Sequence, residues 1–156
     1  MRAHVTIELY VEAPQRVVAR RLLDLAEDSS WWPGARARGE YGWLEVAVGV
    51  GALRRRVTFG AVIGPVREWE GFTWHLKRGE LRGAGEWWLE AFGRGTIVHY
   101  FLDAEAAPEG RGTLAARARR HRAAVRDGLY ALKDALEGRP SNAERGTSIA
   151  SRLRAG

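Results

Sequence analysis

The spacing of apolar positions predicts a long helix near the C-terminal end of the chain. Between Gly112 and Gly138 these positions recur at steps of three or four residues, as they do where one helical face is buried against a partner. At about 1.5 Å per residue such a helix is about 40 Å long, enough to cross a small domain. The predicted buried face consists of Leu114, Ala118, His121, Val125, Leu129, Leu132 and Leu136.

Alternation of apolar and polar residues predicts strands over most of the preceding chain. Residues 5–11 alternate as a half-buried strand does. Pro14 then suits the first turn of a helix, and we expect the helical stretch that it begins to break near Arg20 into two short helices. Glycines separate six further predicted strands, as hairpin turns require; these strands are 35–41, 43–50, 53–63, 66–77, 81–92 and 96–104.

Together these elements predict an α+β fold in which a seven-stranded, curved antiparallel sheet packs against the long helix. A chain of 156 residues without an internal repeat is expected to form one domain, which we place at residues 1–138. Residues 139–156 lack a sustained periodic pattern and are expected to be a loosely ordered tail. A helix lying across a curved sheet can enclose a pocket, so the pattern indicates a binding cavity more clearly than any chemistry.

Composition narrows the classes of site that the chain can carry. It contains no cysteine, which excludes disulfides, thiolate zinc sites, iron–sulfur clusters and cysteine nucleophiles. The N-terminal residues carry charges at Arg2, Glu8 and Glu12 and lack the apolar core of a signal peptide. No apolar run is long enough to span a bilayer. We therefore expect a soluble, cytoplasmic protein.

The net charge of +6 raises the question of an anionic partner. Nearly all of the positive charge is arginine, since only Lys77 and Lys133 are lysines, and such a bias can come from the nucleotide composition of a genome. We therefore disfavour a nucleic-acid partner. The arginines of the long helix are expected on its solvated side; they are Arg117, Arg119, Arg120, Arg122 and Arg126.

Several short motifs, in their order along the chain, are typical of one superfamily. They are APQRV at 13–17, LLD at 22–24, WWPG at 31–34, GEWWL at 85–89, GTIVHY at 95–100 and LYALKDALEG at 129–138. With the order of elements, these motifs resemble the START-like (SRPBCC) superfamily over residues 3–138. That superfamily includes polyketide cyclases/dehydrases, lipid-transfer proteins and plant pathogenesis-related proteins. The resemblance implies a helix-grip fold with a ligand cavity between sheet and helix.

Aromatic residues form the candidate ligand site. Trp87 and Trp88 are adjacent on one predicted strand, so the first faces the interior and the second the outer surface. Inner aromatic side chains either fill the core or form a wall for a flat or lipid-like ligand. The outer Trp69 and Trp88 could instead cover a homodimer contact. The predicted ligand-binding set is Trp32, Tyr41, Phe59, Phe72, Trp74, Trp87, Tyr100 and Val125.

Two residues are the candidates for catalysis. Arg55 shares its strand parity with the inward-facing Phe59, so its guanidinium could hold a carboxylate or enolate; alternatively it lies near the strand end and reaches water. His121 lies on the buried helix face and could act as a general acid or base, or it is a satisfied core residue. The histidines show no metal-ligand spacing, and no phosphate loop or nucleophile turn is present. No metal or cofactor is expected.

We therefore expect the protein to bind a hydrophobic or aromatic small molecule between the sheet and the long helix. The resemblance implies a polyketide cyclase/dehydrase-like or lipid-binding activity, and whether the protein is an enzyme stays open. One alternative is a non-catalytic carrier or sensor of lipids, quinones or isoprenoids. Another is an interaction module that presents its arginine-rich helix face to RNA or to an acidic protein.

Overall fold

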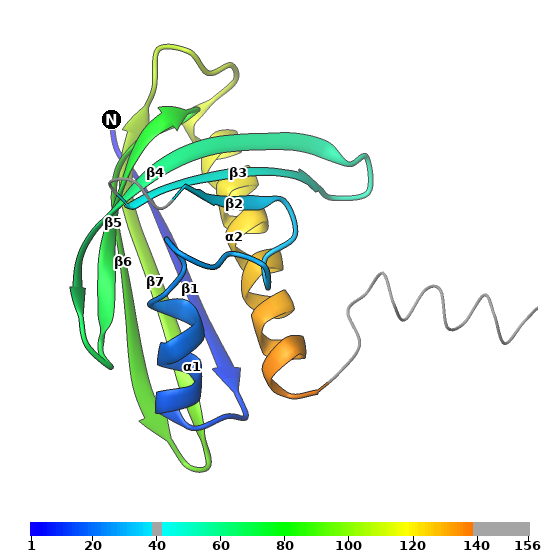
Figure 1. Ribbon diagram of the computed structural model, residues 1–156. Helices are drawn as coiled ribbons and strands as arrows, with labels where there is room; N and C mark the ends of the chain where they lie inside the picture. The colour runs from blue at the N-terminus through cyan, green and yellow to red at the C-terminus, as the bar shows by residue number, and fades with distance from the viewer. Residues whose placement is uncertain (39–41, 139–156) are drawn as a thin grey trace, which may run out of the picture.

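The computed structural model describes residues 1–38 and 42–138, whose strands form one curved sheet around a long helix (Figure 1). Tyr41 and the predicted tail at 139–156 lie outside the described residues. The strands are β1 (Ala3–Val11), β2 (Ala35–Arg38), β3 (Trp43–Val50), β4 (Arg55–Arg67), β5 (Gly71–Gly79), β6 (Leu81–Phe92) and β7 (Gly95–Ala106), and the helices are α1 (Gln15–Leu22) and α2 (Leu114–Leu136).

The described strands form a seven-stranded sheet in the order β1-β7-β6-β5-β4-β3-β2. Every neighbouring pair is antiparallel. Register shifts between Gly60 and Ala61 and between Ile63 and Val66 interrupt the β4–β5 pairing, and such irregularities bend a strand. The β2–β3–β4 end of the sheet arches over α2 (Figure 1). The predicted α+β helix-grip architecture is confirmed.

The connection after β1 differs from the prediction of two short helices. The helix α1 follows Pro14 as expected, but residues 23–27 form turns, with the Glu27 N–H bonded to the Asp24 carbonyl. The chain still buries Leu22 and Leu25 completely. Turns therefore place both leucines in the core without a second helix.

The helix α2 begins and packs as its sequence predicts. The Thr113 hydroxyl caps it by accepting a hydrogen bond from the Ala116 N–H at 3.1 Å. His121, Val125 and Leu129 are buried on the face toward the sheet. Neither helix in the described part of the chain combines the length and apolar character that a bilayer crossing needs.

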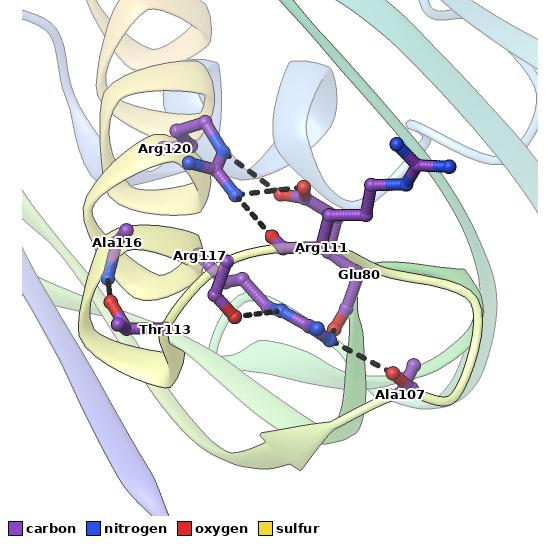
Figure 2. A network of polar contacts seen from close by, with 8 residues as sticks. Glu80, Ala107, Arg111, Thr113, Ala116, Arg117 and Arg120 are labelled. Carbon is purple, nitrogen blue, oxygen red and sulfur yellow. Dashed lines mark hydrogen bonds and ion pairs between the residues drawn. The ribbon is translucent and has the colours of Figure 1, made fainter.

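Two arginines predicted to be solvated are instead part of a polar network at the start of α2 (Figure 2). Arg117 is only 7% exposed, and its Nη1 donates to the backbone carbonyls of Glu80 at 2.9 Å and Ala107 at 2.8 Å. Arg120 makes two hydrogen bonds, of 3.0 and 2.8 Å, to the Glu80 carboxylate. The prediction failed because the β5–β6 turn approaches this end of the helix. The turn brings the carbonyl and the carboxylate of Glu80 within hydrogen-bond distance of the two arginines. Arg119, Arg122 and Arg126 are exposed as predicted.

Candidate functional site

The predicted aromatic residues meet in the interior between the sheet and α2. Strand parity is confirmed, since Trp87 is fully buried and Trp88 is 39% exposed. The buried group contains seven of the eight predicted ligand-binding residues, together with His121; its members are Trp32, Phe59, Phe72, Trp74, Trp87, Tyr100, Val125 and His121. These side chains form one continuous core cluster, which we call the aromatic cluster.

Trp74 lies at the centre of the aromatic cluster. Its ring meets Trp87 edge-on, with 5.1 Å between centroids, and stacks on Trp32 at 6.4 Å. The register places Trp74 opposite Gly85 on β6, where an added Cβ would overlap the Trp74 indole. Glycine at this position therefore lets the indole lie across the neighbouring strand. Because such edge-on and offset contacts are favourable beyond their buried area, the cluster is also a stabilising element.

A buried chain of hydrogen bonds runs through the aromatic cluster to α2. Trp74 Nε1 donates to Tyr100 Oη at 3.2 Å, and Tyr100 Oη lies 2.8 Å from His121 Nε2. The indole N–H can only donate, so the tyrosine oxygen accepts from it and shares a second hydrogen bond with the His121 ring. The tautomer of the imidazole decides which of these two side chains is the donor in that second hydrogen bond.

Burial keeps both partners of this contact uncharged near neutral pH. Desolvation lowers the pKa of His121 to about 3 and raises the pKa of Tyr100 above its ordinary value, because burial disfavours the charged form of each group. His121 and Tyr100 can therefore donate and accept hydrogen bonds, but neither carries a charge that would attract an ionic ligand.

The aromatic cluster largely fills the space in which the sequence predicted a cavity. The hollow beside His121, which Phe59 and Arg117 also line, has a volume of only about 10 Å³, room for one water molecule at most. Within the described residues, the Trp87 Nε1–H is buried without a hydrogen-bond partner. An unpaired buried donor costs roughly 1–3 kcal/mol, so the interior holds one polar group that a bound molecule could satisfy.

A larger pocket of about 520 Å³ opens next to the aromatic cluster, and we call it the Trp32 pocket. It lies between β3, α2 and the segment that carries Trp32, and the indole of Trp32 belongs to both the pocket wall and the cluster. Its other lining residues are Pro33, Gly34, Ala47, Val48, Gly49, Arg54, Asp127, Gly128, Tyr130, Ala131 and Asp134. This volume is in the range of small-molecule sites.

Gly128 allows Trp32 to close the inner end of this pocket. An added Cβ at Gly128 would overlap the Trp32 indole, which therefore lies directly against the backbone of α2. The sequence analysis found Trp32 but missed Gly128. A signal was present, because a glycine inside a helix costs about 1 kcal/mol relative to alanine and so indicates close packing.

Arg55 is the predicted site residue that the structure places away from the interior. It is exposed at the first residue of β4, after a turn in which Leu53 is 94% exposed. The β3–β4 hairpin projects beyond α2 (Figure 1), so a side chain of inward parity reaches water there. Of the two alternatives for Arg55, a position near the strand end that reaches water is confirmed and the cavity-facing one is wrong; the first inward residue of β4 is the buried Val57.

The remaining predictions for the site concern metals and dimerisation. The part of the chain that the structure describes contains no group of three or more His, Asp or Glu residues placed to hold a metal ion. Trp69 is 38% exposed, but it lies in the turn between β4 and β5, where strand parity does not apply, and its ring lies under Arg16 of α1. A homodimer contact through Trp69 and Trp88 stays a prediction.

Comparison with known proteins gives no match by sequence and clear matches by structure. No protein-family model matches the chain, and no curated protein matches it significantly. Among solved structures, a START superfamily protein from Mycobacterium smegmatis is 16% identical, and the match covers 86% of this chain and 97% of that protein with a TM-score of 0.61.

Two further solved structures have the same architecture. The Zhui aromatase/cyclase from Streptomyces sp. R1128 is 16% identical, with 88% of this chain and 93% of that protein covered at a TM-score of 0.61. Ara h 8.0201 is 12% identical, with 88% and 99% covered at a TM-score of 0.63. Similarity at this level of identity establishes the fold, and the chain therefore has the START-like helix-grip fold that its motifs predicted.

Proposed function

We propose that the protein binds a flat, largely apolar small molecule that carries a hydrogen-bond acceptor. The molecule enters through the Trp32 pocket and packs against the aromatic cluster. The observation that carries this proposal is the position of Trp32, which forms the inner wall of a pocket of about 520 Å³ and stacks on Trp74 within the cluster.

The ligand reaches the interior when the Trp32 side chain leaves its place against Gly128. Trp31 and Trp74 stack on this indole, at 5.8 and 6.4 Å between centroids, and Phe59 meets it at a tilt at 6.5 Å. A flat ligand can replace such contacts with its own rings. The unpaired Trp87 N–H supplies a donor for a carbonyl or hydroxyl oxygen of the ligand. Binding then compensates the cost of that buried donor.

Chemistry on such a ligand would be of the cyclase or dehydrase class. His121 is hydrogen-bonded to Tyr100 and is neutral, so the pair can position a carbonyl and polarise it through a hydrogen bond. The aromatic wall would hold a reactive chain in a folded shape and exclude water. The non-catalytic alternative is a carrier or sensor of lipids, quinones or isoprenoids that uses the same pocket.

The binding proposal is tested by filling the pocket. Ala131 lines the Trp32 pocket, so Ala131→Trp should abolish capture of hydrophobic molecules that co-purify with the wild-type protein in native mass spectrometry. Ala115→Trp, at an exposed position of the same helix, is the matched control and should retain them. Equal capture by both variants, each folded by circular dichroism, would exclude the Trp32 pocket as the ligand site.

The variant His121→Phe distinguishes a catalytic function from that of a non-catalytic carrier. With a linear poly-β-ketone thioester as the probe, this variant should still bind the probe but form no cyclised product. An unchanged rate of cyclisation in the variant would remove His121 from the mechanism. No cyclisation by the wild-type protein, with binding retained, would favour the carrier.

A further inference from the structure

A second hollow lies on the opposite face of the sheet from the aromatic cluster. It has a volume of about 550 Å³ and is lined by Arg36, Glu45, Arg56, Thr58 and Arg78 among others. These residues alternate along their strands with buried ones, such as Val57 and Phe59 on β4, so their side chains stand on the outer face. We call this hollow the arginine pocket.

The strand register explains why a pocket forms here. Glu45 on β3 pairs with Arg36 on β2, and the next outward residue of β3, Ala47, pairs with Thr58 on β4. Small side chains at Ala47 and Thr58 thus form the floor, while longer side chains stand around it. The arginines come from separate strands of the sheet, so the backbone fixes where each guanidinium begins.

The charges of this pocket are unbalanced, with three arginines against one glutamate. Glu45 is already engaged: it accepts a hydrogen bond from Trp43 Nε1 at 3.1 Å and pairs with Arg78 at 3.6 Å and Arg38 at 3.4 Å. Arg78 also lies over the Trp43 ring, 5.8 Å from its centroid. Glu45 and Trp43 therefore hold Arg78 in place but leave the remaining positive charge of the pocket uncompensated.

Arg36 and Arg56 supply that uncompensated charge. Within the described residues neither guanidinium makes a hydrogen bond or ion pair, although both residues line the pocket. Some other arginines of the sheet do have acidic partners: Arg67 pairs with Glu86, and Arg82 with Glu109. Two unpaired guanidiniums that flank one hollow are the feature that points to an anionic ligand.

We propose that the arginine pocket binds the phosphate group of a small organic phosphate. A guanidinium presents a planar fork of donors that matches phosphate oxygens, and Arg36 and Arg56 together match a doubly negative group. The Thr58 hydroxyl on the floor adds one more donor. A volume of about 550 Å³ leaves room for an organic moiety beside the phosphate.

A small molecule is favoured over a nucleic acid by the shape of this surface. The unpaired arginines surround a hollow instead of forming an extended stripe that could follow a phosphate backbone. The exposed arginines of α2, such as Arg119 and Arg122, do not line the pocket. Binding of RNA is therefore an outcome against the proposal.

The test is titration calorimetry with pyrophosphate and with ribose 5-phosphate as probes. The double variant Arg36→Gln/Arg56→Gln should weaken binding of both probes by at least about tenfold. The charge-matched control Arg119→Gln/Arg122→Gln removes the same net charge from α2 and should bind both probes as the wild type does. Circular dichroism verifies the fold of each variant, and all four substitutions are at exposed positions.

Three results would overturn the proposal. They are absence of binding to either probe at millimolar concentration, equal weakening in the two double variants, and RNA binding that depends on the α2 arginines. The ligand proposed for the interior is independent of this site, because Ala131→Trp fills the Trp32 pocket and should leave pyrophosphate binding unchanged. Failure of one proposal is thus distinguishable from failure of the other.

Discussion

At the scale of single residues, two glycines make the aromatic interior possible. An added Cβ at Gly85 would overlap Trp74, and one at Gly128 would overlap Trp32. Neither position has the left-handed backbone that usually explains a glycine. Their role is close approach, since each lets a large indole lie against the backbone of a neighbouring element. The aromatic cluster therefore depends on the glycines at positions 85 and 128 as well as on its large aromatic residues.

The buried His121 predicts how stability depends on pH. Its pKa of about 3 in the folded protein lies below the ordinary value of 6.5, so between these pH values the unfolded chain binds one proton more. The free energy of unfolding should then fall as pH decreases from 6.5 toward 3, by up to about 1.4 kcal/mol per pH unit from this group. Urea denaturation of His121→Gln at pH 7, 6, 5 and 4 should show a shallower decline than the wild type.

Comparison of variants isolates this effect from the other titrating groups. His75→Gln removes an exposed histidine and should leave the steep decline in place. Glutamine at 121 cannot take up a proton, while its side-chain oxygen can still accept from Tyr100. Parallel curves for His121→Gln and the wild type would show that His121 is not the group responsible.

At the scale of elements, α2 is held by polar contacts near both ends and by apolar packing between them. Near its start, Arg117 and Arg120 join it to Glu80 at the β5–β6 turn (Figure 2). Near its end, Lys133 donates to the Tyr10 carbonyl of β1 at 2.6 Å. These contacts fix the helix relative to the sheet, and so fix the width of the space in which the aromatic cluster and the Trp32 pocket lie.

Replacement of Arg117 should loosen the start of α2. Arg117→Met keeps much of the apolar stem but removes the charge-assisted hydrogen bonds to the carbonyls of Glu80 and Ala107, each of which then keeps a backbone N–H donor only. We expect the free energy of unfolding to drop by about 2–3 kcal/mol, with faster amide exchange in the first turns of the helix. Arg119→Met, at an exposed position of α2, should change stability by less than about 0.5 kcal/mol. Similar losses for the two variants would contradict the structural role of Arg117.

The elements were predictable from sequence because their periods are local properties. The alternation around Trp87 and Trp88 and the stripe through His121 determined which residues face the core, and both predictions are confirmed. The role of Arg117 was not predictable in this way. Its charge indicates solvent, and only the approach of a turn from elsewhere in the chain supplies the acceptors that make its burial favourable.

The difference between local periodicity and contacts between distant segments also explains the errors at the candidate site. Arg55 points to the same side of β4 as the buried Val57, as the alternation predicted. Alternation does not tell, however, where the β3–β4 hairpin extends past α2. Arg55 lies in that extension and is exposed. Whether a predicted cavity is hollow depends on how large side chains pack in three dimensions. Here Phe59, Trp74 and Trp87 occupy the space between sheet and helix.

At the scale of the whole molecule, one sheet serves two chemically different hollows. The Trp32 pocket and the arginine pocket share Gly34 and Ala47 in their linings, so they meet beside the middle of β3. The first leads toward an uncharged aromatic interior, and the second carries unpaired positive charge on the outer surface. The two proposed ligands, one apolar and one anionic, would therefore occupy separate hollows of the same curved sheet.

Because the interior is filled, the Trp32 side chain must move before the proposed apolar ligand is seated. Trp32 separates the pocket from the aromatic cluster, so Trp32→Ala should accelerate association of a hydrophobic fluorescent probe, measured by stopped-flow mixing. The same substitution removes a buried indole and should lower the free energy of unfolding by about 3–5 kcal/mol. Trp88→Ala, which truncates an indole on the outer face, should leave the association rate unchanged. If Trp32→Ala bound the probe at the wild-type rate, the movement of Trp32 would not control access to the interior.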